Sequence, residues 1–345
     1  MPQTSPAPAV LILAAGRGTR MKSDIPKVLH RLMGRPLVEH VLNAALYLAP
    51  ARVALVTGHG AEAVEADVRA FMAEQRQRRE GQAAQEPAEA AFAVPEPIFV
   101  RQAEQLGTGH AVSMAREALR DFDGPVVIMS GDVPLISPNT LDGFLKGHQA
   151  LGADLSVLTV TLRDPSAYGR VIRDADGWLE RIVEFRDADD WERSVREINS
   201  GLYVAETAKL FDSIARLSPA NDQKEYYLTD VAADFRSRGL TAAAVEIPES
   251  SAFEVAGIND RYELAEAQAI LKDRINEAWM RAGVTMLDPL STYIESTVRL
   301  SRDVTLWPGV ILTGRTAVGQ GAEIGPFRRL HNRQVAAGEK VGLDD

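Results

Sequence analysis

The residues from Gly16 to Lys27 have the types and spacing of a site that binds phosphate groups. They lie in the stretch "VLILAAGRGTRMKSDIPKVLH" (10–30), where an apolar run passes into a turn with two glycines. Glycine lets backbone N–H groups approach a ligand closely, and aligned N–H groups attract anions. Arg20 and Lys27 add positive charge, and Pro26 restricts the backbone directly before Lys27. We therefore expect a strand and then a phosphate-binding loop, with a plain turn carrying exposed basic side chains as the alternative.

This loop lacks the signatures of two common nucleotide-binding motifs. No Gly-Lys-Ser or Gly-Lys-Thr sequence ends it, which excludes a Walker A loop. Met21 stands where a dinucleotide-binding fingerprint has its third glycine. The sequence therefore indicates a nucleotide loop of another type.

A second polar cluster follows a later predicted strand, in "RQAEQLGTGHA" (101–111). The amide side chains of Gln102 and Gln105 both donate and accept hydrogen bonds, so they could recognise the edge of a base. Gly107 would admit a ring or a ribose, and Thr108 opens a predicted helix. Helix capping by Thr108 is the alternative interpretation.

A carboxylate follows a third predicted strand, in "PVVIMSGDVPL" (125–135). Asp132 would be well placed there to hold Mg²⁺ against phosphates, because hard cations prefer oxygen ligands. An aspartate that caps the next turn is the alternative. Four further polar positions, taken singly, are typical of turn or surface residues. They are Gly169 in "AYGRV", Glu184 in "RIVEF", Asn199 in "EINSG" and Asn259 in "AGINDR".

Short apolar runs alternate with helical patterns over the first 250 residues or so. That alternation predicts a mostly parallel sheet with helices on both faces. Ligands bind at the carboxyl ends of the strands in such sheets, which is where the polar clusters lie. The predicted strands cover 9–16, 52–58, 96–102, 125–132, 153–162 and 196–205, and predicted helices cover 36–48 and 108–122.

The C-terminal part of the chain has a different pattern. After a predicted long helix over 260–283, residues 298–327 divide into five blocks of six, "VRLSRD VTLWPG VILTGR TAVGQG AEIGPF". Val, Thr or Ala opens each block and Leu, Val or Ile stands third, which is typical of a parallel β-helix. A glycine-rich β-meander is the alternative. For residues 71–97 the composition predicts an extended helix and a solvated, partly disordered loop, to which we assign no chemistry.

The bulk composition limits the class of protein. With 345 residues the chain is long enough for two domains, and its 46% hydrophobic and 25% charged residues are ordinary for a globular protein. The net charge of −10 argues against a general nucleic-acid or membrane-surface binder. The absence of cysteine excludes disulfides, thiolate metal sites and a cysteine nucleophile. Since no apolar stretch reaches about 18 residues and the N-terminus has no basic region, we expect a cytoplasmic protein without a signal peptide or membrane span.

The combination of motifs resembles a known enzyme family. The order Leu-x-Ala-Gly-x-Gly-Thr-Arg-Met, four residues and then Pro-Lys is similar to sugar-nucleotide pyrophosphorylases. With "AEQLGTGHA", "GDVPLI", "DPSAYGRV", "EINSGLYV", "EYYLTD" and "GIND" it resembles the bifunctional bacterial enzymes of UDP-N-acetylglucosamine synthesis, over residues 9 to about 327. In that family an N-terminal uridyltransferase precedes a C-terminal left-handed β-helix acetyltransferase.

The resemblance implies a fold and a division into segments. The fold would be an α/β, Rossmann-like (GT-A-like) nucleotidyltransferase with a mostly parallel mixed sheet, followed by a short stub of left-handed parallel β-helix. The segments would be the nucleotidyltransferase domain (1–255), a linking helix (256–284), the truncated hexapeptide β-helix (285–327) and an irregular tail (328–345).

The resemblance also implies a reaction. An oxygen of N-acetylglucosamine-1-phosphate would attack the α-phosphorus of UTP with Mg²⁺ as cofactor, to give a cell-wall precursor and pyrophosphate. No general base is needed because the sugar phosphate is already an anion. The resemblance assigns the charge neutralisation of the triphosphate and the leaving pyrophosphate to Arg20 and Lys27, and Mg²⁺ binding to Asp132 and Asn259. The nucleotide would be held by Ala14, Ala15, Gly16 and Gly18 with Lys27, and uracil and ribose would be recognised by Gln102, Gln105, Gly107 and Thr108. The sugar would be held by Gly169, Glu184 and Asn199.

The chain departs from the family pattern near the expected sugar pocket and at the C-terminus. Ser130 stands where the family usually has tyrosine, and Phe185-Arg186 where many members have a polar or basic pair. The resemblance places the family's acetyltransferase residues in coils beyond 298–327, so we expect no acetyltransferase activity. Since 298–327 gives fewer than two coils of about 18 residues and so little surface for trimerisation, we expect a monomer or weak oligomer. His331, the only histidine of the tail, is expected on the surface. Transfer to another sugar phosphate or from another nucleotide, and a non-catalytic nucleotide-binding scaffold, are the alternative functions.

Overall fold

The computed structural model describes residues 7–85 and 93–343 and separates into two compact units. The first unit takes in Met1–Leu29 and Val38–Gly257. The second takes in His30–Leu37 and Ile258–Asp345. Among the described residues, no helix has the length and apolar character needed to cross a membrane.

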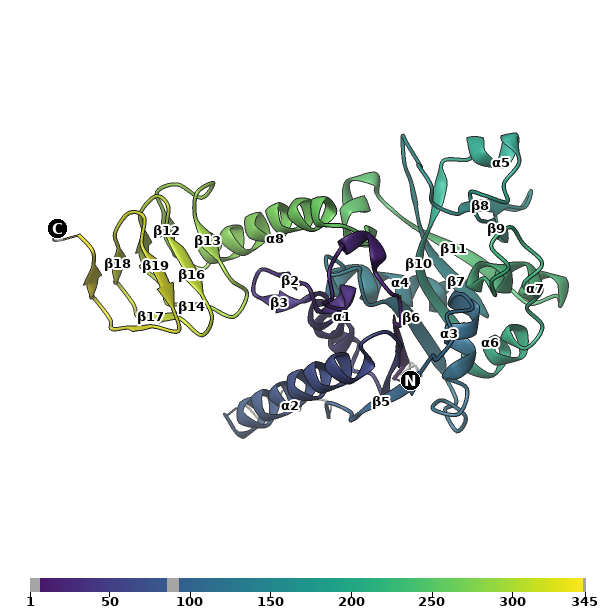
Figure 1. Ribbon diagram of the computed structural model, residues 1–345, viewed down its shortest axis with the longest axis horizontal. Coiled ribbons are helices and arrows are strands. Elements are labelled where there is room, and N and C mark those ends of the chain that lie inside the picture. The colour runs from purple at the N-terminus through teal and green to yellow at the C-terminus, as the bar shows by residue number, and fades with distance from the viewer. Residues whose placement is uncertain (1–6, 86–92, 344–345) are drawn as a thin grey trace. The chain divides into compact units, whose positions relative to one another are not determined.

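The first unit is built on a mixed sheet with the strand order β11-β7-β10-β6-β1-β4-β5 (Figure 1). β1 pairs in parallel with β4 and β6, and β4 with β5, whereas β10 runs antiparallel to both β6 and β7. This confirms the predicted mostly parallel α/β sheet, and each of the six predicted strands is present with its ends shifted by at most two residues. The strands of the path are β1 (Ala9–Ala14), β4 (Arg52–Thr57), β5 (Pro97–Arg101), β6 (Pro125–Ser130), β7 (Leu155–Thr161), β10 (Glu197–Glu206) and β11 (Ala242–Ile247).

Helices cover both faces of this sheet because its central strands are apolar on both sides. Successive side chains of a strand point to opposite faces, so Val10 and Ile12 pack into one core cluster while Ala9 and Leu11 pack into the other. The first cluster includes residues of α1, α2 and α4, and the second includes residues of α3, α6 and α7. The helices are α1 (Leu37–Ala45), α2 (Ala61–Gln85), α3 (Thr108–Met114), α4 (Pro138–Leu151), α5 (Asp190–Ser194), α6 (Thr207–Ile214) and α7 (Val231–Ser237).

Two predicted helices differ in length from those observed. The helix predicted over 36–48 is α1 followed by a 3₁₀ turn, η3 (Leu46–Leu48). The one predicted over 108–122 ends early, because α3 stops at Met114 and turns follow. In the 71–97 segment the predicted helix is the second half of α2, while part of the predicted loop, 86–92, lies outside the described residues.

A hairpin that the sequence did not reveal branches from the sheet. β8 (Arg170–Arg173) and β9 (Leu179–Val183) pair antiparallel with each other, and β8 joins β10 through the single pair Ile198↔Arg170. Their turn is closed by Gly177, whose φ of 86° favours glycine. The other end of the hairpin lies where β8 begins and β9 ends.

The second unit consists of the small β2–β3 pair, α8 and a parallel β-helix. Parallel pairing in three ladders, β12-β15-β18-β21, β13-β16-β19 and β14-β17-β20, rules out the β-meander alternative. The first and third positions of the predicted six-residue blocks point into its core; Val304, Val310, Leu306 and Leu312 are fully buried. The elements are β2 (Arg31–Leu32), β3 (Arg35–Pro36), α8 (Arg261–Arg281), β12 (Thr285–Met286), β13 (Tyr293–Ile294), β14 (Arg299–Leu300), β15 (Thr305–Leu306), β16 (Ile311–Thr313), β17 (Ala317–Val318) and β18 (Glu323–Ile324).

The expectation of an irregular tail after residue 327 is wrong. β19 (Arg329–His331), β20 (Gln334–Val335) and β21 (Lys340–Val341) continue the three ladders, and Leu330, Val335 and Val341 are buried in the β-helix core. The period was hidden because Ala317 pairs with Gln334, one residue short of the 18-residue offset that relates Ile311 to Arg329. The described β-helix is therefore longer than the fewer than two coils that the sequence indicated.

Candidate functional site

The loop after β1 is shaped so that Lys27 packs directly against Gly18. Gly18 has a φ of 59°, and a Cβ atom on it would lie 2.6 Å from the Cβ of Lys27. Gly18 also precedes the 3₁₀ turn η1 (Thr19–Met21), which is pinned to the core by the fully buried Met21. Backbone conformation and space therefore both require glycine here, as the sequence indicated for a tight loop.

Lys27 lies in η2 (Lys27–Leu29) and forms an ion pair with Asp132. The hydroxyl of Ser130 donates to Oδ1 of the same carboxylate at 2.5 Å, and Lys27 binds Oδ2, so both carboxylate oxygens have a partner. The sheet explains the meeting, because Leu13 at the end of β1 is paired with Ser130 at the end of β6, and the Gly131 N–H donates to the Leu13 carbonyl at 2.9 Å. The predicted phosphate loop and the predicted metal-binding aspartate are thus brought together at one edge of the sheet.

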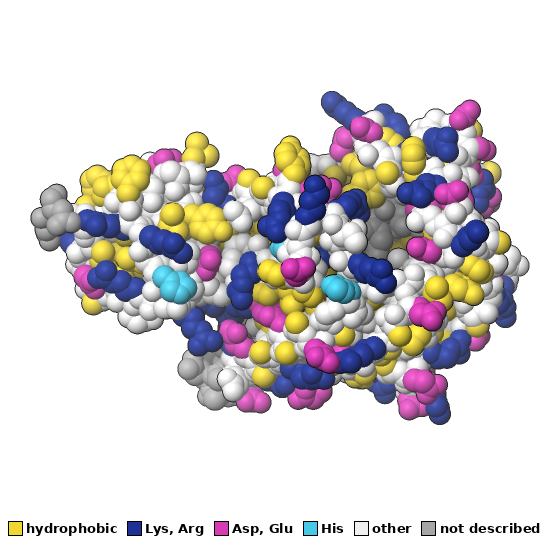
Figure 2. All heavy atoms as spheres, viewed as in Figure 1, with side chains coloured by type: hydrophobic (Ala, Val, Ile, Leu, Met, Phe, Trp, Pro, Cys, Tyr) yellow, Lys and Arg dark blue, Asp and Glu magenta, His cyan; other side chains and the backbone are white. Residues whose placement is uncertain are grey.

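The loop after β5 meets the loop after β1 through Gln105. Gln105 Oε1 accepts a hydrogen bond from Arg17 Nε at 2.7 Å, and its Nε2 donates to the Ala15 carbonyl at 3.3 Å. Arg20, in η1, is exposed. Figure 2 shows Lys and Arg side chains interspersed with acidic ones on the face of the molecule that it draws. Polar groups of the first two predicted clusters therefore share one edge of the sheet.

The other members of the second cluster hold their own loop in place. Gln102 is buried, and its Nε2 donates to the Gly107 carbonyl at 3.2 Å. Gly107 is the N-cap of α3, with a φ of 106°, so the alternative of a capping Thr108 does not hold. Thr108 Oγ1 instead accepts a hydrogen bond from Leu228 N at 3.1 Å.

The stretch 225–228 is a neighbour that the sequence alone did not place. A Cβ on Gly107 would lie 2.6 Å from the Tyr226 carbonyl, and the Tyr226 N–H donates to the Leu106 carbonyl at 2.8 Å. The Gly109 N–H donates to the Tyr226 carbonyl at 2.7 Å. The two glycines of "LGTGHA" were the available signal, since each allows a backbone to approach closely.

The three residues expected on the sugar side also lie together. A Cβ on Gly169 would lie 3.6 Å from Glu184 Oε2, and the Asn199 N–H donates to the Gly169 carbonyl at 3.0 Å. Asn199 lies where the pairing of β10 with β7 shifts register, and its Oδ1 accepts from Gly201 N at 2.9 Å. Gly169 and Glu184 flank the open end of the β8–β9 hairpin, one before β8 and one after β9.

Glu184 lies in an acidic and desolvated environment. Burial raises its pKa above the usual value, and the neighbouring carboxylates of Asp230, Asp187 and Glu225 add to the shift, while a hydrogen bond from Thr229 Oγ1 at 3.2 Å opposes it. The pKa of Asp230 is raised as well, first by burial. A ligand with several hydroxyl donors would add hydrogen bonds that favour the charged form of this carboxylate.

The donor set suits a hard divalent cation. Among the described residues no group of three or more His, Cys, Asp or Glu side chains could enclose a metal ion. An ion at the Asp132 carboxylate would therefore need ligands other than a cluster of acidic, histidine or cysteine side chains, and Mg²⁺ commonly uses one or two carboxylates with substrate phosphates and water. Asn259 belongs to the second unit and Asp132 to the first, so the predicted pairing of the two as metal ligands stays a prediction.

Comparisons with known proteins agree on one kind of domain. Residues 10–224 match the family model described as MobA-like NTP transferase domain. The chain is 46% identical over 317 residues to "Bifunctional protein GlmU" of Geobacter metallireducens, covering 92% of this chain and 61% of that protein. It is 41% identical over 335 residues to the protein of the same name from Heliobacterium modesticaldum, covering 97% of this chain and 67% of that one. The chain thus spans three fifths to two thirds of the length of these relatives.

A solved structure supports the fold. The crystal structure of UDP-glucose pyrophosphorylase complexed with UDP-glucose superposes with a TM-score of 0.56 at 18% identity, covering 77% of this chain and 99% of that one. At that identity the likeness speaks for the fold alone.

Proposed function

The chain belongs to the GlmU family and carries a nucleotidyltransferase domain of the MobA-like type, and from that premise we propose that it transfers UMP from UTP to N-acetylglucosamine-1-phosphate. The products would be UDP-N-acetylglucosamine and pyrophosphate. The observation that carries the proposal is the cluster of Lys27, Asp132 and Ser130 beside the Gly18 loop, at the carboxyl ends of β1 and β6. This cluster combines fixed positive charge, a carboxylate and a tight glycine turn, as transfer between two phosphate compounds requires.

The reaction would proceed by direct displacement at phosphorus. A phosphate oxygen of the sugar phosphate attacks the α-phosphorus of UTP, the bond from that phosphorus to the bridging oxygen breaks, and pyrophosphate leaves with the electron pair. The nucleophile is an anion already, so the protein need not remove a proton. The chain's contribution is positioning and neutralisation of charge.

We assign the charge neutralisation to Arg20 and Lys27. Lys27 is the better supported of the two, because Gly18 and Asp132 hold its side chain at the end of the sheet. A triphosphate bound at the loop would offer Lys27 a second anionic partner next to Asp132. Mg²⁺ held at Asp132, with Asn259 as the predicted second ligand, would supply further positive charge against the phosphate oxygens.

We assign the nucleotide part and the sugar part of the product to separate sets of residues in the first unit. The glycine loop, with the backbone of Ala14, Ala15, Gly16 and Gly18, faces the nucleotide phosphates, and Gln102, Gln105, Gly107 and Thr108 form the base and ribose side. Gly169, Glu184 and Asn199 form the sugar side. The contacts among the members of each set support the assignment.

The decisive experiment is a pyrophosphate-release assay with defined substrate pairs. UTP with N-acetylglucosamine-1-phosphate and Mg²⁺ should give release, while glucose-1-phosphate in place of the sugar, or dTTP in place of UTP, should give little. Release with only another pair would keep the reaction class and replace the substrate assignment. A protein that binds UTP but releases no pyrophosphate with any pair would instead be a nucleotide-binding scaffold.

The second activity implied by the word bifunctional in the relatives' name needs a separate assay. The expected lack of acetyl transfer from acetyl-CoA to glucosamine-1-phosphate stays a prediction, which a thiol-release assay tests directly. The expectation of a monomer or weak oligomer rested on fewer than two coils, and the ladders reach Val341. The count of coils therefore no longer supports a monomer, and sedimentation at micromolar concentration is the test of the oligomeric state.

A further inference from the structure

A buried arginine lies directly beside the sugar-side residues and binds backbone carbonyls. Arg170 is 2% exposed. Its Nη2 donates to the Ser166 carbonyl at 2.9 Å, its Nη1 to the carbonyls of Tyr168 and Pro165, and its Nε to the Arg193 carbonyl at 3.3 Å. Burying a guanidinium is costly unless its donors are satisfied, and its planar fork can satisfy several at once.

These carbonyls belong to a turn that leads straight into Gly169. Ser166 has a φ of 46°, a left-handed conformation that is unfavourable for a serine. The turn is closed by hydrogen bonds from Ser166 N to Asp164 Oδ1 at 2.9 Å and from Tyr168 N to the Pro165 carbonyl at 3.2 Å. Arg170 thus holds an unfavourable backbone conformation directly before a predicted sugar-binding residue.

The same guanidinium lies over the ring of Phe185, the residue after Glu184. The Cζ atoms of Arg170 and Arg193 are each 5.3 Å from the Phe185 ring centroid. Arg193 Nε also donates to the Phe185 carbonyl at 3.4 Å. A cation over an aromatic face is attracted by the ring quadrupole, so the ring links the segment of Glu184 to Arg170. This gives a structural reason for phenylalanine where the family pattern has a polar or basic residue.

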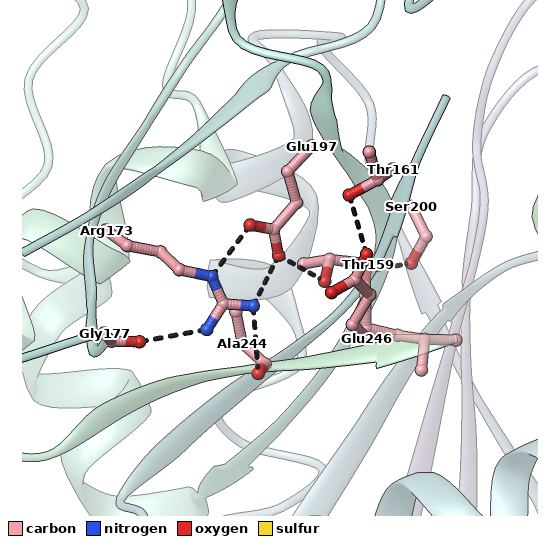
Figure 3. A network of polar contacts seen from close by, with 9 residues as sticks. Thr159, Thr161, Arg173, Gly177, Glu197, Ser200, Ala244 and Glu246 are labelled. Atoms are coloured by element: carbon pink, nitrogen blue, oxygen red, sulfur yellow. Dashed lines mark hydrogen bonds and ion pairs between the residues drawn. The ribbon is translucent and has the colours of Figure 1, made fainter. Parts of the chain in front are cut away.

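The hairpin that carries these residues is tied to the sheet by core packing and by polar contacts at its two ends. Val171, Leu179 and Ile182 are buried in the second core cluster. Near its turn, Arg173 binds Glu197 of β10, from Nη2 at 2.6 Å and from Nε at 2.8 Å, and its Nη2 also donates to the Ala244 carbonyl of β11 at 3.4 Å (Figure 3).

At the open end the backbone ties to the sheet are the pair of Arg170 with Ile198 and the hydrogen bond from the Asn199 N–H to the Gly169 carbonyl. The β8–β9 ladder ends at the pair Arg170↔Val183 and so brings Gly169 and Glu184 side by side, and the contacts of Arg170 fix the segments that continue from them.

We propose that Arg170 and Phe185 are positioning residues for the sugar phosphate. By binding the carbonyls of Pro165, Ser166 and Tyr168 and stacking on the ring, Arg170 fixes the turn that leads into Gly169 and the segment that follows Glu184. The inference rests on the proposed function for its sugar ligand. It predicts that disturbing the stack weakens binding of the sugar phosphate and leaves binding of UTP unchanged, because the glycine loop and Gln105 are held by other contacts.

The test is a set of variants assayed for the two KM values separately. Phe185 lies at the surface, so Phe185→Ala should fold. It should raise KM for N-acetylglucosamine-1-phosphate about tenfold with KM for UTP unchanged. Phe185→Tyr keeps the aromatic face, so its KM for N-acetylglucosamine-1-phosphate should equal that of the wild type. Arg69→Met removes a comparable arginine–phenylalanine contact, 4.5 Å from the Phe99 ring, and should change neither KM.

The backbone part of the inference is tested without substrate. Arg170→Lys keeps a charge but cannot reach the same carbonyls, so hydrogen exchange at the amides of 166–168 should become faster than in the wild type. Equal KM effects on both substrates in Phe185→Ala, no effect at all, or failure of Phe185→Tyr to restore the wild-type value would overturn the proposal. If the wild type releases no pyrophosphate, the proposed function is wrong. Unchanged hydrogen exchange in Arg170→Lys would separately show that Arg170 does not fix the 166–168 turn.

Discussion

The two halves of the candidate site are built in different ways. The phosphate half, with the Gly18 loop, Lys27 and Asp132, lies at the ends of two adjacent parallel strands that are buried on both faces. The sugar half is carried largely by a hairpin that meets the sheet through one residue pair. Buried parallel ladders therefore place the groups proposed to face the phosphates. The groups proposed to face the sugar lie on β10 and beside the short β8–β9 ladder, where the side chains of Arg170 and Arg173 add contacts that hold the hairpin.

This difference has a functional reading. Charge neutralisation works best with groups that do not reorganise during the reaction, and a ladder of buried strands provides that. A sugar with several hydroxyls is recognised by many weaker contacts. Side chains on a hairpin can be changed to suit a different sugar without a change of fold. Single substitutions in the phosphate half should therefore cause large losses of activity, and single substitutions in the sugar half smaller ones.

The largest expected effect is on the phosphate half, from Asp132→Asn. The substitution keeps the size of the side chain but removes the charge that pairs with Lys27 and would hold Mg²⁺. We expect kcat for pyrophosphate release to fall by about 10²–10³. Full turnover in this variant, measured at saturating Mg²⁺, would contradict the role given to Asp132.

Gly18→Ala should affect both the fold and nucleotide binding. The left-handed φ of 59° and the 2.6 Å approach to the Lys27 Cβ both oppose a methyl group, so the free energy of unfolding should drop by about 1–2 kcal/mol or more. Gly16→Ala is the matched control, because nothing lies within 4 Å of its Cβ position; its unfolding free energy should stay within about 0.5 kcal/mol of wild type. Equal losses in urea denaturation of the two variants would show that the close packing on Lys27 is unimportant.

The same difference between the halves explains which elements and site residues could be predicted from the sequence. The strand pairs of the phosphate half follow from uninterrupted apolar runs such as "AVLILA", and the residues after them could be named in advance. The hairpin was missed because "RVIR" and "LERIV" are short and each carries two charged residues. The contact of Gly107 with Tyr226 joins segments far apart in the chain, so no local pattern could place it. In the β-helix, one missing residue between Leu330 and Val335 concealed a ladder that continues.

Arg173→Met tests the anchoring of the hairpin at its turn end. The bidentate pair with Glu197 is mostly shielded, with 31% of the Arg173 side chain and 13% of the Glu197 side chain exposed, and Glu197 also accepts from Thr159 Oγ1 at 2.6 Å. Losing the arginine should lower the free energy of unfolding by about 1–2 kcal/mol. Lys146→Gln breaks the exposed Lys146–Asp142 pair and should cost less than about 0.5 kcal/mol. If the two variants unfold alike, the side-chain anchor near the turn contributes little to folding.

The smallest effect is expected from the charge of Glu184, and its sign is set by the direction of its pKa shift. Burial raises the pKa of Glu184 in the folded protein above its unfolded value. Between the unfolded and the folded pKa the native state binds more protons, so the contribution of this group to stability is present below the unfolded pKa and is lost as the pH rises through the folded pKa. Glu184→Gln removes that loss and should melt at a slightly higher temperature than wild type at pH 7, with the difference shrinking at pH 4. The same variant should bind the sugar phosphate more weakly, because an amide cannot accept hydroxyl donors at both positions. A variant that melts lower than wild type at pH 7 would mean that the hydrogen bond from Thr229 to the charged carboxylate outweighs the cost of burying that charge.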